Sequence, residues 1–138
     1  MPRSNRPLWA ILLLALAFTA NAETVTGRVV GVADGDTLTV LDVDKVQHKI
    51  RLAGIDALEK KQPFGNRSKE SLSELTHDKT VTIETDKRDK YGRQVGKVLV
   101  NGQDVNLVQV ERGMAWHYKA YEREQPETDR KVYANAEN

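Results

Sequence analysis

Alternation of apolar and polar residues with a period of two is the feature that most restricts the fold of this chain. Such a period puts every second side chain on the same face, so each alternating segment predicts a strand with one buried face. Five segments rich in Val, Ile and Thr show the pattern: 24–33, 37–43, 46–53, 80–86 and 95–100. The sequence therefore predicts a mainly β domain.

Two further segments predict helices and fix the order of the elements. The segment 66–78 separates the third strand from the fourth and has a weak apolar face at Leu72 and Leu75. Asp104 can cap a second helix, which ends at Gly113. The order β-β-β-α-β-β-α predicts an α+β fold, a five-stranded barrel of the OB type with two to three helices. Such barrels often bind nucleic acids or sugars, but a fold alone does not define a function.

The first 22 residues have the three-part layout of a secretory signal peptide. Arg3 and Arg6 precede the apolar run "LWAILLLALAFTA", and Ala20-Asn21-Ala22 has the small-x-small pattern of a cleavage site. The run is shorter than the roughly 20 apolar residues of a membrane span. We expect cleavage after Ala22, export to the periplasm or the medium, and no stable membrane association afterwards.

The remaining segment, 23–138, is long enough for one small domain, and we expect it to be a monomer. Loss of Arg3 and Arg6 leaves 19 basic and 20 acidic residues, so its net charge is −1. Affinity for a polyanion must therefore come from local clusters of basic residues. The chain has no Cys, so an exported domain would have no disulfides.

The stretch "VADGDTLTV" predicts the first hairpin. Asp34-Gly35 between apolar runs favours a two-residue type I′ turn, in which both central residues need a positive φ. The turn does not explain Asp36, because aspartate is depleted in strands. A second two-residue turn at Asp44-Lys45 would set the register of the next hairpin. Asp36 would then share a face of the sheet with Arg51.

The chain that leaves the third strand brings Asp56 and Glu59 towards the same place. Three carboxylates at close range raise one another's pKa or bind a cation. Oxygen ligands without Cys or a nearby His favour Ca²⁺ or Mg²⁺ over zinc. The alternative is that Asp56 and Glu59 are ordinary solvated acids of a surface loop.

A second cluster lies in "DKRDKYGRQVG" (86–96), which combines four cations with Tyr91 and Gly92. It is either a solvated hairpin loop or a phosphate-binding loop, since Arg offers a planar fork of donors and Tyr a ring for stacking. Downstream, "GMAWHYKAYER" (113–123) alternates aromatic and basic residues, as a base-stacking wall would. Trp116 itself is expected to pack in the core.

The motifs "DGDT", "IRLAGIDALE" and "DKYGR", in this order, resemble the staphylococcal nuclease family over about residues 25–122. The resemblance implies an OB-fold, Ca²⁺-dependent nuclease that cleaves DNA and RNA and leaves 3′-phosphate ends. By their places in the motifs, it assigns Asp36, Asp56 and the carbonyl of Ala57 to calcium, Glu59 to water activation, Arg51 and Arg93 to the scissile phosphate, and Lys90 and Tyr91 to substrate binding. Tyr118 and Tyr121, which follow the motifs in the chain, are also expected to bind the substrate.

The chain departs from the family in two places. Leu58 stands where the family usually has Pro, so the position of Glu59 would be less rigid. The segment 126–138 predicts the start of a last helix, with Thr128 as a possible cap, and we expect this helix to be incomplete. A non-catalytic OB module that binds single-stranded nucleic acid is the alternative function.

Overall fold

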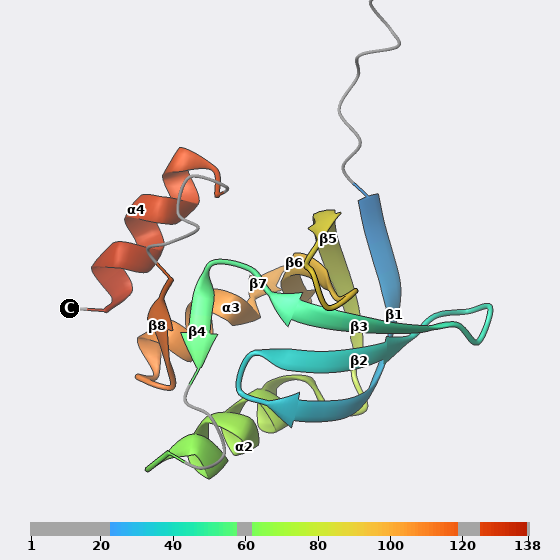
Figure 1. Cartoon of the computed structure of the whole chain (residues 1–138), viewed down its shortest axis with the longest axis horizontal. Helices are drawn as coiled ribbons and strands as arrows, with labels where there is room; N and C mark the ends of the chain where they lie inside the picture. Colours follow the sequence, from blue (N-terminus) through green and yellow to red (C-terminus); the bar gives the residue numbers. More distant parts are fainter. Residues whose placement is uncertain (1–22, 58–61, 119–124, 138) are drawn as a thin grey trace, which may run out of the picture.

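The computed structural model describes residues 23–57, 62–118 and 125–137. Within these ranges five strands close into a barrel, whose members pair as β3-β2-β1-β5-β6 and whose ends join where β3 runs parallel to β6. The five strands are β1 (Glu23–Asp34), β2 (Thr37–Leu41), β3 (Gln47–Leu52), β5 (Thr80–Arg88) and β6 (Gln94–Val100). The predicted α+β fold with a five-stranded barrel is therefore confirmed (Figure 1).

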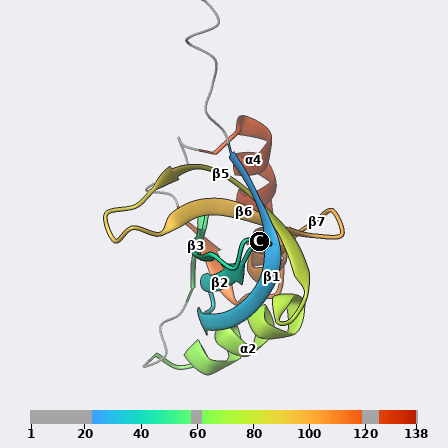
Figure 2. The same cartoon turned by 90° about the vertical axis from the view of Figure 1, so that its right-hand side faces the viewer.

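Shorter elements surround the barrel. Two short strands, β4 (Ile55–Ala57) and β8 (Ala115–His117), pair with each other, and β7 (Gln103–Asp104) extends the main sheet beside β6. The described helices are α2 (Gly65–Thr76), α3 (Val105–Glu111) and α4 (Glu127–Ala136). Figure 2 shows α2 below the curved strands and α4 above them. None of these helices is long and apolar enough to cross a membrane.

The core follows from the alternation in the sequence. Along β1 every second residue from Val25 to Val29 is buried, and Leu38 and Val40 of β2 face the same interior. Leu72 of α2 and Tyr133 of α4 are also buried. Full burial of one such side chain typically contributes about 1.5–3 kcal/mol, so the barrel interior is the main source of stability.

The predicted register between β2 and β3 is wrong by one residue. Thr37, rather than Leu38, lies opposite Arg51. The connecting turn is longer than Asp44-Lys45, because the Lys45 amide donates to the Asp42 carbonyl and Lys45 has a φ of 66°. The Asp42 carboxylate accepts hydrogen bonds from the amides of Asp44 and Val46, and this side chain stabilises the longer turn.

The first hairpin also differs from its prediction. Asp34 pairs with Thr37, so Gly35 and Asp36 are the central residues, and neither has a positive φ as a type I′ turn requires. The Asp34 carboxylate accepts a hydrogen bond from the Asp36 amide, which closes the turn. Gly35 is needed for close packing instead, because a Cβ at this position would overlap the Ser68 side chain of α2.

Three further predictions can be compared with the structure. Asp104 caps α3 by accepting a hydrogen bond from the Leu107 amide, as predicted. Thr128 is not a cap, because α4 begins one residue earlier after Pro126. Trp116 is not in the core: its exposed fraction is 53%, whereas the adjacent His117 is buried.

The predicted signal peptide lies outside the described residues, and the predicted incompleteness of the last helix stays a prediction.

Candidate active site

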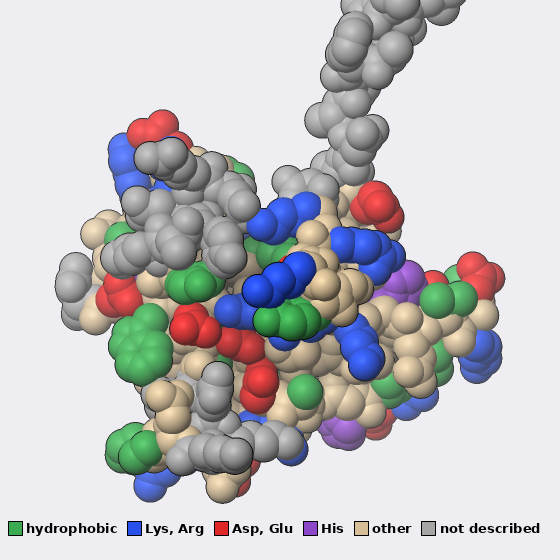
Figure 3. All heavy atoms as spheres, in the orientation of Figure 1, with side chains coloured by type: hydrophobic (Ala, Val, Ile, Leu, Met, Phe, Trp, Pro, Cys, Tyr) green, Lys and Arg blue, Asp and Glu red, His purple; other side chains and the backbone are tan. Residues whose placement is uncertain are grey.

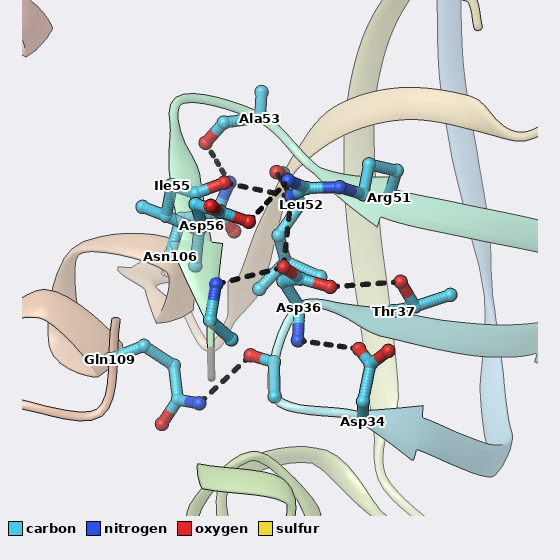
Figure 4. A network of polar contacts seen from close by, with 12 residues as sticks. Asp34, Asp36, Thr37, Arg51, Leu52, Ala53, Ile55, Asp56, Asn106 and Gln109 are labelled. Carbon is cyan, nitrogen blue, oxygen red and sulfur yellow. Dashed lines mark hydrogen bonds and ion pairs between the residues drawn. The ribbon is translucent and has the colours of Figure 1, made fainter. Parts of the chain in front are cut away.

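Asp36 lies in the turn before β2, where contacts to three other segments hold it (Figure 4). Its backbone carbonyl accepts a hydrogen bond of 2.8 Å from the Leu52 amide. Its carboxylate accepts a hydrogen bond of 2.9 Å from the Ala57 amide and one of 3.0 Å from the Thr37 hydroxyl. The residue is only 7% exposed. Asp36 is therefore a fixed, buried acceptor between the end of β3 and the end of β4.

The pKa of Asp36 is raised to about 6, chiefly by burial and also by the hydrogen bond with the Asp34 side chain, whereas the charge of Arg51 opposes the shift. A raised pKa means that the ionised carboxylate is poorly solvated in the folded protein. An additional cation beside Asp36 would thus be favoured. The pKa of Asp34 is lowered, chiefly by hydrogen bonds with Asp36, although its partial burial acts in the opposite direction.

Arg51 lies between two carboxylates. Its Nη1 is 3.5 Å from Asp36 Oδ2, and its Nη2 is 3.5 Å from Asp56 Oδ1. Nη1 also donates hydrogen bonds of 2.8 Å to the carbonyls of Leu52 and Ile55, which fix the guanidinium group. The structure thus brings Asp36, Arg51 and Asp56 together. The register shift does not separate them because Asp36 lies in a turn, where strand alternation does not set the direction of its side chain.

The oxygen atoms in this cluster fit a hard divalent cation in kind. Asp36 and Asp56 supply carboxylates, and the Ala57 carbonyl belongs to the next residue of β4. Among the described residues there is no group of three or more His, Cys, Asp or Glu side chains that could hold a metal ion. Glu59, the third predicted acid, lies outside the described residues, as does Leu58.

Arg93 approaches the cluster from the β5–β6 hairpin. Its Nε donates a hydrogen bond of 2.7 Å to Asp89 Oδ2, and its backbone amide donates one of 3.0 Å to Asp89 Oδ1. Its Nη1 donates a hydrogen bond of 3.4 Å to the Thr37 hydroxyl. Thr37 in turn donates to Asp36. A polar chain therefore connects Arg93 with Asp36 and Arg51, although these residues come from separate parts of the sequence.

Tyr91 lies beside two cations at the tip of the same hairpin. Its ring centroid is 5.2 Å from Lys90 Nζ and 5.3 Å from the guanidinium carbon of Arg93. The residue is 71% exposed, so its ring is accessible to a ligand. An exposed aromatic ring between cations suits a nucleotide, which carries both a base to stack and a phosphate.

A cavity of about 750 Å³ adjoins these groups. It is bounded by the β3–β4 connection, the β5–β6 hairpin and the start of α4. Its lining includes most of the predicted phosphate- and substrate-binding residues: Arg51, Lys90, Tyr91, Arg93 and Tyr118, together with Lys87. Figure 3 shows Lys and Arg side chains gathered near the centre of this face, next to acidic ones. Tyr121 lies outside the described residues.

The sequence did not identify several residues that hold the site in place. Thr37 belongs to the "DGDT" motif and Asp89 is four residues before Arg93, so both had a local signal. Gln109 and Asn106, two buried amides of α3, had a weaker one. Gln109 donates to the Gly35 carbonyl, and Asn106 donates to the Ala53 carbonyl. Only their polar character within the apolar run "VNLVQV" distinguishes them in the sequence.

Comparisons with known proteins found a matching family model and several similar proteins. The family model described as staphylococcal nuclease homologue matches residues 49–138. A Haemophilus influenzae protein named as an uncharacterized endonuclease is 42% identical over 111 residues, which are 80% of this chain and 62% of that protein. An Escherichia coli O157:H7 protein of the same name is 41% identical, over 80% of this chain and 72% of its own. A Shigella flexneri micrococcal nuclease is 37% identical, over 84% and 71%.

Proposed function

Since this chain belongs to the staphylococcal nuclease family, we propose that it is an exported, calcium-dependent endonuclease that hydrolyses phosphodiester bonds of DNA and RNA. The names of its relatives, two endonucleases and a micrococcal nuclease, support the reaction class. The observation that carries the proposal is that a group suited to bind a cation lies next to a cavity suited to bind a nucleotide. The buried Asp36 carboxylate, which Arg51 contacts directly and Arg93 reaches through Thr37, adjoins a cavity lined with cations and tyrosines.

The two arginines would bind the phosphate that is cleaved. Arg51 and Arg93 both line the cavity, and each is oriented by hydrogen bonds to fixed acceptors. Oriented guanidinium groups stabilise the negative charge that builds on phosphoryl oxygens in the transition state. Glu59 would accept a proton from the attacking water, a role that rests on its place in the motif.

Asp36, Asp56 and the Ala57 carbonyl would hold the calcium ion. When bound, such an ion polarises a phosphoryl oxygen and orients a water molecule. Asp36 fits this role because it is held rigidly by Ala57 and Thr37 and its ionised form lacks solvent. The ion would favour that ionised form.

Lys90, Tyr91, Tyr118 and Tyr121 would bind the nucleotide beside the scissile bond. The first three line the cavity, where Tyr91 offers an exposed ring. We propose 3′-phosphate products, as the family resemblance implies. A module that only binds single strands would use the same cations and rings. It would gain nothing from the carboxylates of Asp36 and Asp56, which repel phosphate in the absence of a cation.

The decisive experiment is an agarose-gel assay of plasmid DNA and of RNA with the purified protein. We expect cleavage with added Ca²⁺, none in excess EGTA, and recovery when Ca²⁺ is restored. Labelling of the product ends before and after phosphatase treatment tests the 3′-phosphate. Binding without cleavage would favour the non-catalytic module, and cleavage in excess EGTA would exclude the calcium assignment. N-terminal sequencing of the protein released from cells tests cleavage after Ala22.

A further inference from the structure

Trp116 occupies an unexpected position beside the proposed site. In the antiparallel pair of β4 and β8, Trp116 lies directly opposite Asp56. Their neighbours Ile55, Ala115 and His117 are buried, so the side chains of Asp56 and Trp116 point to the other, outer face. Directly opposite residues have Cβ atoms about 4.5–5.5 Å apart. An indole ring that is 53% exposed is therefore adjacent to a carboxylate of the site.

The packing of the protein does not require an indole ring at this position. Tryptophan gains most free energy when its large apolar surface is buried. Here β8 buries the smaller side chains of Ala115 and His117 instead and leaves the largest one facing solvent. An exposed, rigid aromatic ring beside a phosphate-binding site is suited to stack on a nucleobase, because every base offers a flat π face.

The cavity ends next to this position. Gly54, Ile55 and Tyr118 line the cavity, and the Tyr118 amide donates 2.8 Å to the Gly54 carbonyl. Asp56 and Trp116 lie one pair farther along the same two strands and are not part of the lining. In Figure 3 acidic side chains lie between the central basic cluster and a large hydrophobic side chain over β8. A nucleic-acid strand that leaves the cavity past Arg51 and Asp56 thus reaches Trp116.

We propose that Trp116 is a stacking platform for the nucleobase on the side of the scissile phosphate that faces away from the cavity. The inference rests on the proposed nuclease function, and it adds a second binding position to that of Tyr91 and Tyr118. Substrates with a nucleotide on both sides of the cleaved bond would be preferred. This preference suits cleavage within a strand.

The cleavage test uses a short single-stranded oligonucleotide with one ordinary phosphodiester and phosphorothioates elsewhere, which directs hydrolysis to one bond. Two further versions lack the base on one or the other side of that bond. We expect loss of one of these bases to lower wild-type kcat/KM about 5- to 150-fold, the range of one stacked base. The same loss should leave the kcat/KM of Trp116→Leu unchanged. Loss of the other base should lower the kcat/KM of both proteins by the same factor.

Two variants control for the chemistry and the surface. Trp116→Phe keeps an aromatic ring and should retain most of the sensitivity to the missing base. Val43→Ala removes an exposed apolar side chain from the distant β2–β3 loop and should behave as the wild type. Equal effects of both missing bases on the wild type and Trp116→Leu would overturn the proposal for Trp116, while leaving nuclease activity established.

A binding measurement tests the role of Trp116 independently of cleavage. Absence of cleavage would refute the proposed nuclease function, but it would leave this measurement possible. The full chain has two Trp residues, and Trp9 lies in the signal peptide that we expect to be removed, so Trp9→Phe leaves Trp116 as the only Trp whether or not cleavage occurs. Stacking quenches indole fluorescence. We expect a fully phosphorothioate oligonucleotide to quench Trp116 emission in Ca²⁺, and removal of one particular base to abolish the quenching. Unchanged emission, or quenching that is independent of both bases, would overturn the proposal.

Discussion

Gln109 donates a hydrogen bond of 2.9 Å from Nε2 to the carbonyl of Gly35, the residue that precedes Asp36. The same amide donates 3.1 Å to the Ser68 carbonyl, and its Oε1 accepts 2.6 Å from the Ser71 hydroxyl. Gln109 is fully buried. Helix α3 therefore fixes both the turn that carries Asp36 and the first half of α2.

We expect Gln109→Leu to lower both stability and activity. Leucine has a similar volume, but it cannot donate to the Gly35 and Ser68 carbonyls or accept from the Ser71 hydroxyl. A buried polar group that loses its partner typically costs about 1–3 kcal/mol. The free energy of unfolding in urea should fall by about 3 kcal/mol. Cleavage should fall even at temperatures where the variant is folded, because the turn loses its anchor.

Gln103→Leu is the matched control, since Gln103 is an exposed residue of β7. Its free energy of unfolding and its cleavage rate should stay near the wild-type values. Equal losses in the two variants would mean that the hydrogen bonds of Gln109 contribute nothing specific.

The barrel could be predicted from the sequence, because alternation marks each strand and the helix between the third and fourth strands restricts the topology. The register could not. It depends on one side chain, Asp42, whose hydrogen bonds to Asp44 and Val46 lengthen the turn. Burial along β8 was also missed, because a segment of three residues has too little pattern to show that His117 faces inwards and Trp116 outwards.

The candidate site was predictable where its residues stand in local motifs. Asp36, Arg51, Asp56 and Arg93 all lie in the three motifs, and the structure brings them together. Their supports were less predictable, since Gln109 reaches Gly35 across 74 positions. Only the folded barrel shows which backbone carbonyls these buried amides satisfy.

We expect Arg93→Ala to lose most of the turnover and to keep its fold. Arg93 lines the cavity and is the donor that the β5–β6 hairpin supplies to the site. The hairpin keeps the hydrogen bonds from the Tyr91 and Arg93 amides to Asp89 when the side chain is removed. Removal of one such donor typically lowers kcat by about 10²–10³. Initial rates on an oligonucleotide and circular dichroism on the same sample measure the two effects.

Arg28→Ala removes the same charge elsewhere. Arg28 forms an exposed ion pair with Asp78, which contributes little to stability. This variant should cleave at the wild-type rate. If Arg93→Ala also did so, Arg93 would have no part in the reaction.

Asp36→Asn should stabilise the protein when calcium is absent. The pKa of Asp36 is raised from 3.8 to about 6, so its ionised form favours the unfolded state and stability falls as the pH rises from about 4 to about 6. Above that range the neutral amide avoids a cost of about 1–3 kcal/mol. In EGTA at neutral pH we expect a higher melting temperature for the variant than for the wild type.

Calcium should reverse this order. An ion that binds only the folded protein raises the melting temperature of the wild type, whereas the variant lacks one of the ligands and gains less. Cleavage by the variant should be lost at the same time. A variant that is less stable than the wild type in EGTA, and equally responsive to calcium, would contradict both the burial cost and the proposed ligand.

The contact between His48 and Asp42 should make stability decrease as the pH rises above 6.5. His48 Nε2 is 2.7 Å from Asp42 Oδ2, and Nδ1 is 2.8 Å from the Gln94 side chain. The hydrogen bond with Asp42 raises the pKa of His48, although partial burial and Arg88 oppose the shift. A raised folded pKa adds stability that is complete below the ordinary value of 6.5 and is lost as the pH rises through the folded pKa.

The free energy of unfolding should therefore fall as the pH rises above 6.5 and through the raised pKa of His48, and it should fall less in His48→Gln. Asp42 does not produce this slope, because its lowered pKa acts in the acid range. His77→Gln serves as the control, since His77 is an exposed residue just after α2. Urea titrations at each pH measure the slopes. The same decrease in His48→Gln as in the wild type would show that the charged pair does not stabilise the β2–β3 turn.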